Sequence, residues 1–122
     1  MNGVIVFLGG GLGAFVRYIL YLILPRMSYF PAGTLVSNFL GCFIATVVFM
    51  YFVSKSDVSS VYKTLLITGF CGGLSTLSAL SLELLVFIQT EEYVRAILYT
   101  AATVFVCTTS VLLGVIFVKH CL

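Results

Sequence analysis

Hydrogen-bond donors lie inside apolar sequence in three parts of this chain. One is the amide of Asn38, and the others are hydroxyl groups, at Ser75, Thr76, Ser78, Ser81, Thr108, Thr109 and Ser110. Amides and hydroxyls can donate to an anion and so replace part of its hydration shell. A small, strongly hydrated anion needs such donors, because leaving it bare in hydrocarbon is prohibitively costly. The donors therefore predict a narrow anion path, but they do not name the anion.

Arg17 and Glu83 are the two ionisable residues deepest in apolar sequence. Charges in such positions are costly and usually functional. Arg17 is suited to draw anions into an aqueous vestibule, whereas a single embedded carboxylate cannot form the acidic ring of a cation path. With His120 as the lone histidine, neither a nucleophile–base pair nor a metal-ligand set can be assembled, so we do not expect an enzyme.

Two adjacent glycines, Gly72 and Gly73, are followed by hydroxyl residues in the middle of a long apolar run. These are poor helix formers, and we predict that the helix breaks here. Non-helical backbone at membrane depth is tolerated only where it is buried in protein or lines a wet cavity. Broken helices hold ions, because freed carbonyls coordinate cations and freed N–H groups attract anions. The alternative is a plain glycine kink whose serines bond to their own helix.

The elements that position these groups follow from composition. Of the 122 residues, 61% are hydrophobic and only 8% are charged, with a mean hydropathy of +1.23, whereas a soluble domain carries about 25% charged residues. A bilayer crossing needs roughly 20 apolar residues. Four such runs are present, over residues 3–24, 33–53, 61–90 and 94–118. We therefore predict one all-α membrane domain, over residues 1–122, with four transmembrane helices.

Small or polar residues recur at helical spacing along the apolar runs. In the first run Gly9, Gly13 and Arg17 are four residues apart, and the fourth run carries Thr100, Thr103, Cys107, Ser110 and Gly114. Membrane helices associate through such small-residue faces, so we expect these faces to point inward, most of them for packing.

A dinucleotide fingerprint is also spelled in the first run, by Gly9, Gly11 and Ala14. That site requires strand–helix alternation and an acid about 20 residues later. No acid precedes Asp57, and the dinucleotide interpretation is rejected. The cysteine spacing predicts neither a zinc site nor a disulfide framework.

The loop charges give a weak orientation signal. One side would carry Lys55, Lys63 and Lys119, and the other Arg26 and Arg95. Topology usually follows the excess of Lys and Arg. Three against two leaves two possibilities open: one orientation set by weaker cues, or insertion in both orientations with antiparallel pairing of two copies.

Three segments of the chain carry recognisable motifs: residues 9–18 read GGGLGAFVRY, residues 33–41 read GTLVSNFLG and residues 69–83 read GFCGGLSTLSALSLE. Together they resemble the motifs of the bacterial CrcB/Fluc fluoride channel family. The resemblance spans the chain and implies a dual-topology antiparallel dimer with two narrow fluoride pores and a central sodium ion. It implies passive fluoride efflux across the cell (inner) membrane, with fluoride, sodium, the lipid bilayer and a second subunit as partners; a nucleic-acid partner is not expected.

The same resemblance assigns roles by position. Asn38 would be the pore-lining amide, Gly72 and Ser75 would hold sodium through their backbone carbonyls, and Arg17 would lie near a vestibule. The polar lining of the pathway would include Ser78, Ser81 and one or two hydroxyls from Thr108, Thr109 or Ser110.

One departure from the family concerns Leu77 and Leu80, which stand where the family has phenylalanines. A phenylalanine offers an anion its positive ring edge, and leucine does not. Three interpretations stay open: a heterodimer with a Phe-bearing subunit, a homodimer that conducts with leucine, or loss of conduction.

Two other functions compete with a fluoride channel. A small multidrug-resistance-type transporter would need an acid in the first helix, where this chain has Arg17. A non-conducting membrane assembly protein would make the amide and the break incidental.

Overall fold

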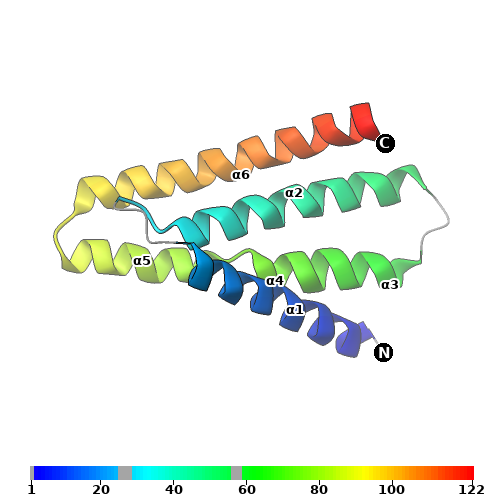
Figure 1. Cartoon of the computed structure of the whole chain (residues 1–122), viewed down its shortest axis with the longest axis horizontal. Coiled ribbons are helices and arrows are strands. Elements are labelled where there is room, and N and C mark those ends of the chain that lie inside the picture. Colours follow the sequence, from blue (N-terminus) through cyan, green and yellow to red (C-terminus); the bar gives the residue numbers. More distant parts are fainter. Residues whose placement is uncertain (1, 25–28, 56–58) are drawn as a thin grey trace.

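The computed structural model describes residues 2–24, 29–55 and 59–122, and every regular element in that part of the chain is helical. In chain order the elements are α1 (Asn2–Ile23), α2 (Ala32–Ser54), α3 (Ser60–Lys63), the π-helical η1 (Thr64–Cys71), α4 (Gly72–Leu74), α5 (Leu77–Gln89) and α6 (Tyr93–Cys121). The helices lie roughly along the long axis of the molecule, and α1 extends from one end to about its middle (Figure 1).

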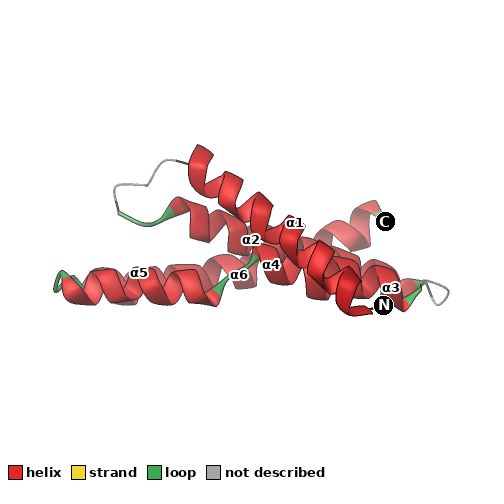
Figure 2. Cartoon of the chain, turned by 90° about the horizontal axis from the view of Figure 1, so that it is seen from below, coloured by secondary structure: helices red, strands yellow, loops and turns green. Residues whose placement is uncertain are grey.

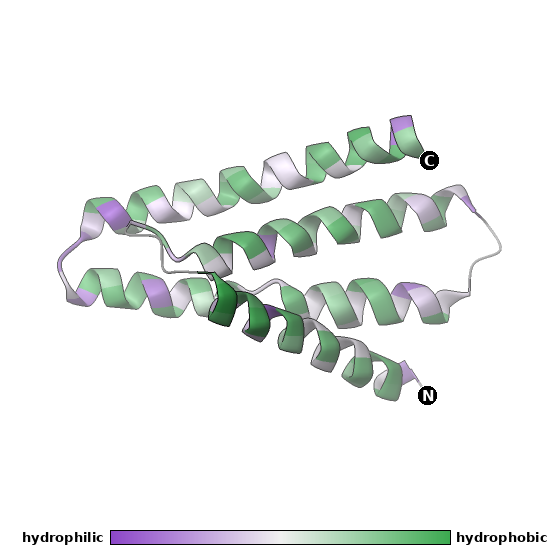
Figure 3. Ribbon diagram, viewed as in Figure 1, coloured by the Kyte–Doolittle hydropathy of each residue, from purple (hydrophilic) through white to green (hydrophobic). Residues whose placement is uncertain are grey.

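The helices are long and apolar enough for four membrane spans, at Asn2–Ile23, Ala32–Ser54, Ser60–Gln89 and Tyr93–Cys121. Hydrophobic residues dominate all four, with the more hydrophilic ones gathered mainly at the ends (Figure 3). The predicted four-span, all-α class is confirmed. The fourth helix extends three residues further than predicted, to Cys121, and the basic Lys119 and His120 lie in its last turn, where positive charge favours the helix dipole.

Neighbouring spans run in opposite directions. Both described ends of the chain and the start of α3 lie at one end of the molecule, and the α5–α6 turn lies at the other (Figure 1). α2 packs along α6, whereas α1 packs on η1 and α4 and crosses them obliquely (Figure 2). α1 therefore contacts the third span on one side, where its geometry changes from the π-helical η1 to the α-helical α4.

Glycine allows α1 and the third span to pack backbone against backbone. A Cβ at Gly9 would lie 2.5 Å from the Leu65 carbonyl oxygen, and one at Gly73 would overlap the Gly10 carbonyl. A Cβ at Gly13 would meet the backbone of the third span as well. The predicted small-residue face of the first helix is thus a packing face, as is usual between membrane helices.

Candidate ion pathway at the helix break

The third span is interrupted two residues after the glycine pair. α4 ends at Leu74, Ser75 is extended (φ −78°, ψ 151°), Thr76 is extended (φ −153°, ψ 125°), and α5 begins at Leu77. The predicted break is confirmed, and it falls on the two hydroxyl residues that follow the glycine pair. Gly72 keeps right-handed helical angles (φ −64°, ψ −34°). Gly73 provides close packing against α1, and Ser75 and Thr76 supply the interruption.

The side chain of Asn38 bridges the break from α2. Its Oδ1 accepts from the Thr76 backbone N–H at 2.7 Å, and its Nδ2 donates to the Thr76 carbonyl at 3.3 Å. Asn38 is only 6% exposed. The amide therefore pairs with Thr76 as a neighbouring strand would and holds this residue in its extended conformation.

At the break, the carbonyls of Gly72 and Ser75 are among those that lose their helical donors, and in both cases the donor bonds to a side chain instead. In a continuous α-helix the carbonyl of residue i accepts from the N–H of residue i+4. The N–H of Thr76, which would bond to Gly72, donates to Asn38 instead. The N–H of Ala79, which would bond to Ser75, donates to the Thr76 hydroxyl at 3.2 Å and so caps α5. Gly72 and Ser75 are the residues predicted to bind sodium through their carbonyls.

Most of the predicted hydroxyls donate their hydrogen to backbone carbonyls. Ser81 bonds to the carbonyl of Leu77 at 3.0 Å and Thr108 to that of Val104 at 2.8 Å, both within their own helices. Ser75 bonds to the Cys71 carbonyl at 2.9 Å. The fully buried Ser110 bonds across to α2, at the Phe39 carbonyl, at 2.6 Å.

Thr76 and Ser78 differ from these, since their hydroxyl oxygens lie 3.0 Å apart and bond to each other. Only one of the two hydrogens is used in that contact. The Thr76 oxygen already accepts from Ala79, so one hydroxyl hydrogen of the pair remains available beside the break. Thr109 lies half-buried on α6.

A cavity of about 330 Å³ opens at the break, between α2, α5 and α6. Its lining joins residues of the second, third and fourth spans: Asn38, Ser75, Thr76, Leu77, Leu80, Thr103, Val104, Cys107 and Thr108. Leu77 is 75% exposed and Leu80 only 5% exposed. The two leucines thus lie in different surroundings within one chain, the first facing outward and the second packed with Phe87 and Tyr99.

Seven residues beyond Thr76, the carboxylate of Glu83 is held by two hydroxyls. Thr34 donates to it at 2.6 Å and Tyr99 at 2.5 Å, while the Tyr21 hydroxyl lies 3.3 Å from that of Thr34. Thr34 and Tyr99 are fully buried.

Tyr99 was missed from the sequence, where it reads as one more apolar residue of the fourth run. A signal exists in its spacing, because Tyr99, Thr103 and Cys107 recur every four residues, and Arg95 lies four residues before them. Arg17, predicted near a vestibule, is half-buried on α1, one turn beyond Gly13. Arg26 lies outside the described residues.

Four membrane spans, the third interrupted by a polar break that a buried amide bridges, define a multi-pass membrane protein of the channel or transporter class. Comparison with known proteins then gives the family. The chain belongs to the family described as CrcB-like protein, Camphor Resistance (CrcB), whose model matches residues 4–115. The family predicted from the three motifs is confirmed.

Curated relatives are similar over most of their length. The chain is 40% identical to the fluoride-specific ion channel FluC of Pyrococcus abyssi, over 95% of this chain and 94% of that protein. It is 36% identical to FluC of Flavobacterium psychrophilum, over 93% of each. It is 38% identical to FluC of Escherichia coli, over 76% of this chain and 74% of that protein. These relatives are ion channels and not enzymes.

Proposed function

We propose that this chain is a subunit of a fluoride-specific channel that lets fluoride leave the cell passively across the cell membrane. The observation that carries the proposal is the polar break, at which Asn38 and Thr76 border a cavity between three spans. The Ser78 hydroxyl lies 3.0 Å from that of Thr76. The names of the relatives supply the anion.

The polar groups fall in an order that suits a path along α5 and α6. From the break cavity at Thr76, α5 leads over seven residues, about 10 Å at 1.5 Å per residue, to Glu83 and its hydroxyl donors. On α6 the same direction runs from Thr103 back to Tyr99. Glu83 also lines a second cavity, of about 290 Å³, toward the α5–α6 turn. Fluoride would pass from donors at the break to donors around Glu83 and then to water.

The hydroxyls that bond to their own helix would take part by rotating. A serine or threonine hydroxyl has one hydrogen, and those of Ser81 and Thr108 are used on backbone carbonyls four residues earlier. Such bonds are weak, with a net value of about 1 kcal/mol. An anion that must replace its water shell offers a stronger acceptor, so exchange of the hydrogen bond is favourable when fluoride arrives. The roles of Ser78, Ser81, Thr108 and Ser110 stay predictions.

The assembly that we propose is an antiparallel dimer of two copies around a sodium ion. Its support is the pair of Gly72 and Ser75 carbonyls, whose helical donors are diverted to side chains. Two carbonyls from one chain cannot complete the coordination of a sodium ion, but a second copy supplies two more. Freed carbonyls at broken membrane helices commonly coordinate sodium. Among the described residues, no cluster of three acidic, histidine or cysteine side chains competes as a metal site.

The exposure of Leu77 supports a pathway that lies between two subunits. Leu77 is 75% exposed on the single chain and lines the cavity at the break, so a second subunit would cover it. The second subunit can be a copy of this chain or a homologous Phe-bearing subunit. In both cases Leu80, which is packed inside its own chain, would approach the anion from the core side.

Efflux from liposomes tests the function. Vesicles that hold potassium fluoride and potassium chloride are reconstituted with the purified chain, and efflux is started with a potassium ionophore and read with ion-selective electrodes. Fluoride release with chloride retained is expected, and Asn38→Ala should lower it, whereas Ser54→Ala, at the exposed end of α2, should not. Equal release of both anions would contradict a selective channel.

Three further experiments test the proposed assembly. If the chain alone releases no fluoride but does so once a Phe-bearing homologue is added, the heterodimer is the working form. Removal of sodium should lower the thermal stability of the dimer if the Gly72 and Ser75 carbonyls bind this ion. Lysines added to one side, to force a single orientation, should abolish homodimer function if pairing is antiparallel.

A further inference from the structure

Arg95 is fixed at the α5–α6 end of the molecule by contacts on several sides. Its Nε donates to the Tyr29 carbonyl at 2.5 Å, and its Nη1 lies 3.1 Å from a carboxylate oxygen of Glu92. The guanidinium carbon lies 4.8 Å from the ring centre of Phe87 and 5.2 Å from that of Tyr29. The guanidinium thus lies against both rings, where cation–π attraction limits its movement.

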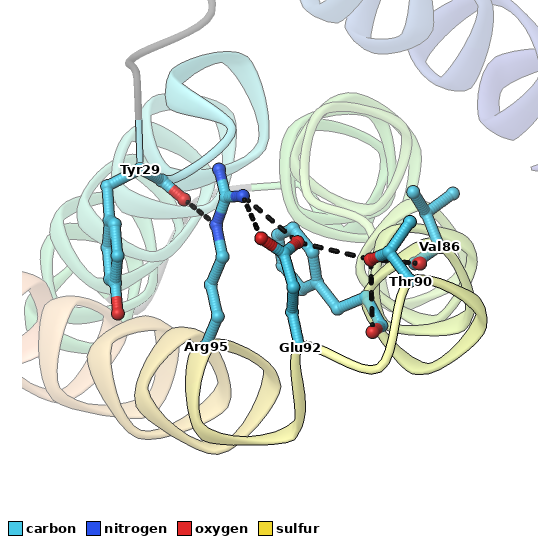
Figure 4. A network of polar contacts seen from close by, with 6 residues as sticks. Tyr29, Val86, Thr90, Glu92 and Arg95 are labelled. Carbon is cyan, nitrogen blue, oxygen red and sulfur yellow. Dashed lines mark hydrogen bonds and ion pairs between the residues drawn. The ribbon is translucent and has the colours of Figure 1, made fainter.

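Glu92 is itself oriented by the turn. The Thr90 hydroxyl lies 3.1 Å from the same Oε2 atom of Glu92 that Arg95 contacts, and it is also within hydrogen-bond distance of the Val86 and Phe87 carbonyls at the end of α5. Its single hydrogen can serve one of these acceptors at a time. Figure 4 shows this chain of contacts, in which Glu92 lies between Thr90 and Arg95. These contacts therefore hold the charge of Arg95 at one position, whereas an exposed arginine on a protein surface samples many positions.

The position of that charge is what suggests a role. Arg95, Glu92 and Thr90 line the cavity of about 290 Å³ that Glu83 also lines. Glu83 and Glu92 are both acids, so this cavity, which we call the mouth of the pathway, would repel anions if no cation were present. Arg95 is only 24% exposed at its side chain, and its charge acts on the cavity more strongly than a fully solvated one would.

We propose that Arg95, held by Glu92 and Tyr29, is the electrostatic element that keeps this mouth open to small monovalent anions. The inference rests on the proposed function, because it concerns the end of the pathway opposite to the helix break. A unit charge about 7 Å away in water changes the local concentration of a monovalent ion by about threefold, and by more where the surroundings are less polar. Arg95 offsets one of the two acids, and Glu92 sets how much of its charge remains.

The test measures fluoride efflux from liposomes for Arg95→Gln, Arg95→Lys and Glu92→Gln, at about 20 mM and about 500 mM of an impermeant salt. Arg95→Gln should slow efflux threefold or more at low salt, and the defect should shrink at high salt because charges are screened. Arg95→Lys should keep most of the rate, and Glu92→Gln should raise it at low salt. Lys119→Gln removes the same charge from the exposed opposite end of α6 and should change little.

A purely structural role for Arg95 predicts a different pattern. In that case Arg95→Gln and Arg95→Lys are equally slow, the defect is the same at both salt concentrations, and Glu92→Gln is slow as well, since each variant breaks the same clamp. That pattern, or an unchanged rate in Arg95→Gln, overturns the proposal. If the unmodified chain releases no fluoride, alone or with a homologous partner, the proposed function fails instead, and the two failures are distinguished.

Discussion

Replacing Asn38 with alanine removes both hydrogen bonds that hold the break open. The two bonds, at 2.7 and 3.3 Å, each have a net value of about 0.5–1.5 kcal/mol, and interhelical hydrogen bonds in membranes average about 0.6 kcal/mol. Asn38→Ala should therefore destabilise the protein by about 1–3 kcal/mol. The loss should also alter the backbone, because the Thr76 N–H is then available to the Gly72 carbonyl and α4 can continue through the break.

Ser37→Ala is the matched control. Ser37 is the neighbour of Asn38 on α2 and is fully buried, but its hydroxyl bonds only to the Thr34 carbonyl of the same helix, at 3.1 Å. Its removal leaves no buried donor without a partner and should cost less than about 1 kcal/mol. A third variant, Asn38→Asp, keeps the acceptor for the Thr76 N–H but cannot donate to the Thr76 carbonyl.

The assay combines equilibrium unfolding in detergent with fluoride efflux from liposomes. Asn38→Ala should unfold at clearly lower denaturant than Ser37→Ala and should lose most of its efflux, and Asn38→Asp should also be impaired. If Asn38→Ala and Ser37→Ala are equally stable and both release fluoride at the unmodified rate, Asn38 does not hold the break and the reasoning is refuted.

Three more outcomes follow from the packing and the site. Gly13→Ala should disrupt the contact between α1 and the third span, because its Cβ would overlap backbone atoms there, whereas Gly11→Ala should be neutral since nothing lies within 4 Å; unfolding in detergent compares the two. Tyr99→Phe removes one of the two hydroxyls that hold the partly buried Glu83 carboxylate and should slow fluoride efflux with little loss of stability. Leu77→Phe should be tolerated and should speed efflux, because the residue is 75% exposed and gains an aromatic edge, whereas Leu80→Phe, at 5% exposure, should destabilise by about 1–3 kcal/mol through overpacking. Equal effects of the two leucine variants on stability would contradict the burial that separates them.

The spans could be predicted because they depend on composition alone. Each predicted run begins one residue after the observed span, since a stretch of about 20 apolar residues leaves little freedom in a bilayer. The break could be predicted from its residue types, because the hydroxyl residues that follow the glycine pair are poor helix formers. The close approach of α1 to Gly73 could not be predicted, since it is a property of two helices together.

Individual partners in the site could not be predicted, because they are far apart in the sequence. Asn38 was recognised as a donor, but its partner Thr76 lies 38 residues away. Glu83 was recognised as a costly acid in apolar sequence, but the hydroxyl of Tyr99 reaches it only because the chain reverses between α5 and α6. Sequence identifies groups that must be satisfied in a membrane, and the fold decides which groups satisfy them.

The energetics of the break argue for a second copy of the chain. An unsatisfied backbone group costs several kcal/mol in lipid, and the carbonyls of Gly72 and Ser75 have lost their helical donors to side chains of their own chain. Gly72 is exposed on the single chain, within a segment that spans the membrane. Lipid tails cannot satisfy its carbonyl, whereas a cation shared with a second chain can. In the proposed dimer, the diverted hydrogen bonds at the break are thus also a reason for the chain to pair.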